Sequence, residues 1–139
     1  MVLAAGCGGG RLSHGEFVKR ADAICSAYHA ETPPITTPRS YGAILRWGRT
    51  TLPIYAAALQ KLEKLQPPAG DEDAVRAWLA SDRKVERAVR DLIVAAQRRD
   101  FPSVSDAASR AQLAGSESRS AATSLGMTVC GTFAAASGR

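Results

Sequence analysis

The longest unbroken pattern in this sequence is a stripe of mostly apolar residues from Val75 to Ala96, in a segment whose last turn is expected to hold Arg98 and Arg99. Its members step along the chain by three or four positions, which is the spacing of one face of an α-helix. The stripe predicts a long amphipathic helix that starts near Asp71, where acidic residues suit the positive end of a helix. Its members are Val75, Trp78, Asp82, Val85, Val89, Leu92 and Ala96.

Similar spacing in three further segments predicts three more helices. The first begins after Ser13, which fits a capping box with Glu16, and the prolines from Pro33 onward end it. The second runs from about residue 40 to residue 65, and Pro53 inside it predicts a kink.

The fourth helix is expected over residues 103–125, after a turn at residues 100–103, and Gly126 is expected to end it. Short turns between long amphipathic helices favour an up-and-down four-helix bundle, so the expected fold class is all-α. A chain of 139 residues is the length of one domain, which we place at residues 13–131. Residues 132–139 are expected to form a disordered tail.

Small residues precede Cys7, and three glycines follow it. Ala5 and Gly6 directly before this cysteine resemble a bacterial lipobox, in which a signal peptidase cleaves just before a cysteine that carries diacylglycerol. The resemblance implies a lipid anchor on Cys7, with residues 1–12 as the remnant of a lipoprotein signal and a glycine tether. The apolar stretch before Cys7 is shorter than a signal peptide needs. We therefore expect that the true start of the protein lies upstream of Met1, or that the given sequence was trimmed.

The chain contains three cysteines, and an odd number in an exported protein needs an explanation. Lipidation of Cys7 leaves Cys25 and Cys130, which export would place in an oxidising compartment. Cys25 shares a helical stripe with Ala21 and Tyr28, so it is expected to face inward. We therefore predict a Cys25–Cys130 disulfide. Cys25 lies well along the first helix, so the segment before Cys130 must turn back to reach it.

Each end of the predicted domain carries a short motif that contains a cysteine. Residues 17–25 read FVKRADAIC, and residues 125–131 read LGMTVCG. With the lipobox, these motifs resemble small actinobacterial lipoproteins of unassigned function, over residues 3–131. The resemblance implies export and a helical bundle, and it implies no reaction.

The polar residues of the chain fit no common catalytic or metal-binding pattern. There is no nucleophile elbow, phosphate loop or paired-cysteine motif, and the chain has only two histidines. Net charge is +5, without a long basic run, so no nucleic-acid partner is expected. Glu86 and Glu117 are expected at surface positions without partners. We therefore expect no enzymatic activity, no cofactor and no bound metal.

Asp82 is the one charged residue in the long apolar stripe. We expect it on the rim of the bundle, paired with a nearby basic residue; the alternative is a buried carboxylate in a ligand cavity, with Tyr55 as a second polar anchor. Trp47 lies off the leucine seam of its helix, beside Arg46 and Arg49. These three residues either form a contact surface for lipid or a partner, or Trp47 covers the edge of the core.

Together these features predict a non-enzymatic interaction or structural module of the cell envelope, anchored by lipid at the outer face of the cytoplasmic membrane or otherwise secreted. Its partners would be the membrane, through the anchor, and an envelope protein or an anionic envelope polymer. The alternative is a bundle that binds a small molecule between its helices, near Asp82 and Tyr55. A filled core with an exposed Trp47–Arg49 patch would favour the first function, and a cavity reached by Asp82 would favour the second.

Overall fold

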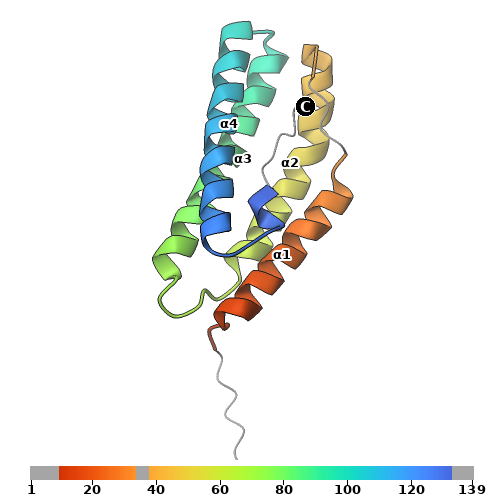
Figure 1. The fold of residues 1–139 in the computed structure, drawn as a ribbon. Helices are drawn as coiled ribbons and strands as arrows, with labels where there is room; N and C mark the ends of the chain where they lie inside the picture. Colours follow the sequence, from red (N-terminus) through yellow and green to blue (C-terminus); the bar gives the residue numbers. More distant parts are fainter. Residues whose placement is uncertain (1–9, 34–37, 133–139) are drawn as a thin grey trace, which may run out of the picture.

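The computed structural model describes residues 10–33 and 38–132, which form four long helices and one short 3-10 turn (Figure 1). These described residues contain no strand, so the predicted all-α class and the helical bundle are confirmed. Cys7, and all of the predicted tail except Thr132, lie outside the described residues. The elements are α1 (His14–Glu31), α2 (Tyr41–Glu63), α3 (Glu72–Gln97), α4 (Phe101–Ser124) and η1 (Cys130–Thr132).

Side-chain caps set the starts of three helices. The Ser13 hydroxyl accepts the Glu16 backbone N–H, as the capping box predicts, and Ser40 caps α2 in the same way. The start predicted for the fourth helix was wrong. Asp100 caps α4 by accepting the Ser103 N–H at 3.2 Å, so the helix begins at Phe101 and includes the expected turn. A proline is tolerated in the first helical turn because its missing N–H has no helical partner there.

The helices pack in chain order, with α1 on α2, α2 on α3, and α4 on α3. Gly48 allows α2 to approach α3 closely, because a Cβ atom at this position would lie 2.6 Å from Cγ1 of Ile93. Pro53 lies inside α2, which continues through it as one helix. The largest side chains of the core include Phe17, Leu59, Leu62, Trp78 and Met127.

The C-terminal segment occupies the place where a simple bundle would bring the first and last helices together. Within the described residues α1 and α4 make no close backbone contact with each other, and η1 packs against both (Figure 1). Gly126, at φ +88°, ends α4 as expected and reverses the chain. The segment then runs back beside α1, as the predicted cysteine pairing requires.

The disulfide between Cys25 and Cys130 is confirmed. Their sulfur atoms are bonded, and their Cα atoms are 5.3 Å apart. Both cysteines are fully buried, and the bridge closes a sequence separation of 105. A bridge across so long a loop stabilises the fold mainly by restricting the unfolded chain.

Asp22, one turn before Cys25, holds the returning segment against α1. Its carboxylate accepts the backbone N–H groups of Thr128 at 3.1 Å, Val129 at 3.0 Å and Cys130 at 2.8 Å. These donors precede or begin the η1 turn, so the acidic group also faces its positive end. Asp22 therefore aligns the segment that carries one half of the disulfide.

We predict that Asp22→Ala lowers the free energy of unfolding by about 2 kcal/mol, because three backbone N–H groups lose a charged acceptor. Urea unfolding of the oxidised protein measures the change. Asp73→Ala is the matched control, since Asp73 is almost fully exposed and pairs only with the exposed Arg76. Equal midpoints for the two variants would show that Asp22 does not hold the segment.

Candidate functional site

A partly enclosed cavity of about 460 Å³ lies between α2, α3 and α4, with the C-terminal part of α1 beside it. We call it the central cavity. Its apolar wall is formed mainly by Leu52, Val85, Val89, Leu92, Ala108 and Ala111. Its polar atoms come from Tyr28, Trp47, Thr51, Tyr55, Gln112 and Arg119.

The cavity exists because α4 faces it with small side chains. Ala108 and Ala111 line this wall, and neither side chain reaches across to α2. The C-terminal segment fills the space between α1 and α4 near Cys25, where Cys130 is bonded. The cavity lies beyond that filled part, and only Tyr28 of α1 borders it.

Two polar groups of the lining residues have no hydrogen-bond partner among the described residues. They are the Thr51 hydroxyl and the indole N–H of Trp47, and both atoms are buried. Thr51 is only 4% exposed. A buried polar group without a partner destabilises the fold by about 1–3 kcal/mol. Both atoms are covered by neighbouring atoms, so they lie behind the cavity surface and not on it. The sequence alone gave no signal for Thr51.

The three residues of the predicted contact surface on α2 have different environments. Trp47 is half-buried, packs against the core and lines the central cavity. Arg46 and Arg49 are exposed. The arrangement matches the alternative in which Trp47 covers the core edge, since its ring is turned toward the cavity wall.

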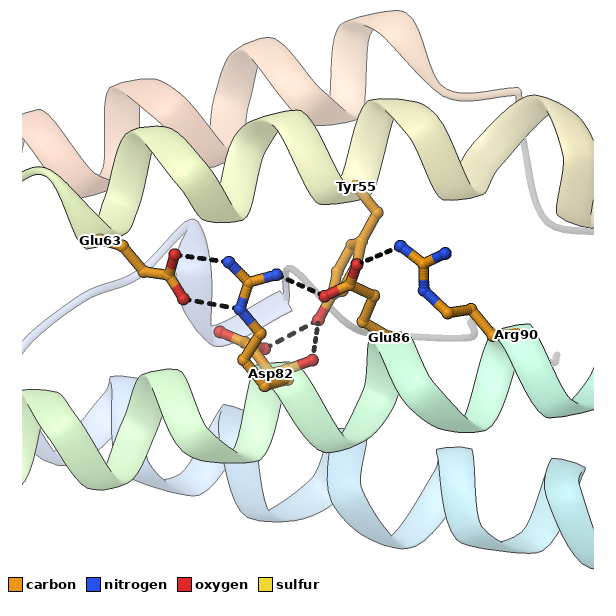
Figure 2. Close-up of polar contacts among 6 residues, drawn as sticks. Tyr55, Glu63, Asp82, Glu86 and Arg90 are labelled. Carbon is orange, nitrogen blue, oxygen red and sulfur yellow. Dashed lines mark hydrogen bonds and ion pairs between the residues drawn. The ribbon is translucent and has the colours of Figure 1, made fainter.

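Asp82 is fully buried, so its expected position on the rim of the bundle was wrong. Its Oδ1 atom accepts hydrogen bonds from the Ser118 hydroxyl of α4 at 2.6 Å and from the Tyr55 hydroxyl of α2 at 3.0 Å. Figure 2 shows Tyr55 reaching from α2 to the Asp82 carboxyl. The expectation failed because α3 packs against both α2 and α4. Two neighbouring helices bury a wider face of α3 than a single neighbour would. No basic residue pairs with Asp82 within the described residues.

Burial shifts the pKa values of Asp82, Tyr28 and Tyr55. It raises the pKa of Asp82 to about 6, and the hydrogen bonds from Ser118 and Tyr55 oppose part of that rise. Burial, with the nearby Asp82 charge, raises the pKa of Tyr28 to about 12 and raises the pKa of Tyr55 well above its ordinary value. Both tyrosines therefore keep their protons near neutral pH. Tyr55 lines the cavity and donates its hydroxyl proton to the Asp82 carboxyl.

Glu86 is also buried and paired, so its expected unpaired surface position was wrong. It is 6% exposed and accepts from Arg83 at 2.5 Å and from Arg90 at 2.7 Å. Burial raises the pKa of Glu86, but the hydrogen bonds and charges of Arg90 and Arg83 outweigh it and lower the pKa overall. Arg83 also binds both carboxylate oxygens of Glu63, so this network joins α2 to α3 beside Tyr55 (Figure 2).

Glu117 lies at the surface as expected, but it is not unpaired. Its carboxylate is 3.2 Å from the Lys84 ammonium group, and both side chains are about half exposed. The pair joins α3 to α4 on the outside of the bundle. Exposed pairs of this kind contribute little to stability.

Neither a metal site nor a membrane-spanning helix is present in residues 10–33 and 38–132. No three His, Cys, Asp or Glu side chains gather there in a way that could hold a metal ion. No helix in those ranges combines the length and the apolar character needed to cross a bilayer. Comparisons with protein-family models, with curated proteins and with solved structures found no match.

We predict that the buried Asp82 carboxyl makes stability depend on pH in a defined window. Its pKa is raised from an ordinary 3.8 to about 6, so the folded state holds the proton more tightly than the unfolded chain. The resulting stabilisation is complete below about pH 4 and is lost as the pH rises through about 6, by about 3 kcal/mol in all. Urea unfolding across this range should show the loss in the wild type and not in Asp82→Asn.

The same assignment can be checked at the carboxyl group itself. Carbon NMR of the wild type should show one aspartate carboxyl titrating near pH 6. Ser118→Ala should raise that pKa further, because the Ser118 hydroxyl favours the charged form. A carboxyl that titrates at its ordinary value in both proteins would contradict the buried assignment.

Proposed function

We propose that this protein is a lipid-anchored binding protein of the cell envelope, which holds a small and mostly apolar molecule in the central cavity. The observation that carries the proposal is the partly enclosed and mostly apolar cavity itself, whose described lining carries a single formal charge, at Arg119. The volume of about 460 Å³ supports it, because small-molecule sites usually measure about 300–1,000 Å³.

Ligand binding is favoured over a purely structural or interaction role. The interaction hypothesis needs a filled core and an exposed aromatic patch, whereas Trp47 is half-buried beside an open cavity. Arg46 and Arg49 remain available on the outer face for an envelope protein or an anionic polymer. That second contact would be compatible with ligand binding.

The proposed role is binding without catalysis. Asp82 is not part of the cavity wall, and its carboxyl is held by Tyr55 and Ser118. Tyr55 both lines the cavity and donates to this carboxyl. Asp82 therefore orients Tyr55 and does not act directly on a bound molecule.

Envelope localisation is supported by the cysteines. A buried Cys25–Cys130 disulfide fits an oxidising compartment, since the cytoplasm keeps thiols reduced. The lipobox resemblance around Cys7 supports anchoring to the outer face of the cytoplasmic membrane. One lipidated cysteine and one disulfide account for all three cysteines.

We predict that the neutral fluorescent probe N-phenylnaphthylamine binds the wild type and quenches its tryptophan emission, since Trp47 lines the cavity. Ala111→Phe should weaken binding by about tenfold or more, because the larger side chain fills the cavity. Ala80→Phe is the matched control at an exposed position of α3 that does not line the cavity. Unfolding midpoints of both variants show that the fold is retained. Equal probe affinities in all three proteins would exclude the cavity as the site.

We predict that Cys7 carries the anchor. In a bacterial host, the full reading frame should take up a fatty-acid analogue and partition into the detergent phase. Cys7→Ser should lose the label, because no thiol remains to accept the lipid. Gly10→Ser, which keeps all three cysteines, is the control and should keep the label. A wild type that stays unlabelled would contradict the anchor.

A further inference from the structure

We infer that the ligand of the central cavity is a single-chain amphiphile with an anionic head group, bound with its head at Arg119 and its chain toward Trp47. The inference rests on the ligand-binding function proposed above and adds the class of ligand and its orientation. It is carried by an unpartnered arginine at one end of a mostly apolar cavity.

Arg119 carries the only formal charge among the described residues that line the cavity. It is half-buried, and it forms no ion pair within the described part of the chain. Arg83 and Arg110, by contrast, each bind two carboxylates. A guanidinium group in a partly desolvated wall has a strong preference for a carboxylate or phosphate, which it binds through two parallel hydrogen bonds.

The single formal charge of the described cavity lining lies toward one end. Ser118 and Tyr55 donate to the same oxygen of Asp82, so they lie at one level of the bundle, and Arg119 directly follows Ser118. Ala108 lies on the same wall about three turns earlier in α4, or about 16 Å away. A medium-length alkyl chain therefore has room to extend from the Arg119 end.

The opposite end of the cavity suits this chain. Trp47 lies about two helical turns before Tyr55 on α2, and Leu92 lies about two turns after Val85 on α3. Both side chains belong to the cavity wall. Thr51, one turn from Tyr55, also lines the cavity between the two ends, with its hydroxyl oxygen covered.

A cationic ligand is disfavoured, because no carboxyl group lines the described part of the cavity. Glu86 is paired with Arg83 and Arg90, and Asp82 accepts two hydrogen bonds. Neither carboxyl group lines the cavity. A cation would meet the Arg119 charge without a compensating carboxylate.

The test compares ligands that differ only in the head group. The affinities of dodecanoate and dodecanol for the wild type are measured by displacement of N-phenylnaphthylamine at about pH 8, where the fatty-acid carboxyl is ionised. We expect dodecanoate to bind about tenfold more tightly, because it forms a charge-assisted hydrogen bond with Arg119. Arg119→Gln should remove this preference, so that dodecanoate and dodecanol bind the variant with similar affinity. Arg87→Gln is the control, since Arg87 is exposed, does not line the cavity and changes net charge equally.

A third ligand, dodecyl phosphate, distinguishes a fatty-acid carboxylate from a lipid phosphate as the head group. The inference is supported if either anion binds more tightly than dodecanol and if Arg119→Gln removes the difference. The ratio of the two anion affinities then identifies the preferred head group. Equal affinities for dodecanol and both anions in the wild type would overturn it, as would tighter binding of dodecyltrimethylammonium. Failure of the probe and of every ligand to bind would instead reject the proposed function itself.

Discussion

One buried carboxyl group fixes the positions of three helices along the bundle axis. Asp82 on α3 accepts from Tyr55 on α2 and from Ser118 on α4, so a slide of either helix along α3 would break a hydrogen bond inside the core. Breaking such a bond leaves a buried polar group without a partner, which costs more than the bond itself contributes. The cluster therefore holds the Tyr55 ring where it forms part of the cavity wall.

The closure of α1 onto the bundle depends on a second set of polar contacts. Asp22 accepts three backbone N–H groups of the returning segment, and the Cys25–Cys130 bridge then makes the arrangement covalent. The segment replaces a direct packing of α1 on α4 at this end of the bundle. Because it extends over only part of their length, the small side chains of α4 border an open space farther along.

The cavity combines apolar area for binding with a few polar atoms for selectivity. In the proposed binding role, burial of a ligand's apolar surface would supply most of the affinity. Arg119 adds charge at one end. A lipid-anchored protein with such a cavity would meet amphiphilic molecules at the membrane surface where it is held.

The sequence alone predicted three features of the fold. Helix periodicity predicted the all-α class, and the capping box at Ser13 predicted the start of α1. The number of cysteines predicted the disulfide. These are properties of local spacing or of counting, which need no knowledge of neighbours. Only the tertiary structure decided that Asp82, Glu86 and Thr51 are buried and that Arg119 has no ion pair among the described residues. A polar residue on a helical stripe has the same spacing whether it lies at the rim or in the centre. Its burial and its partners depend on which other helices pack against that stripe, and at what level.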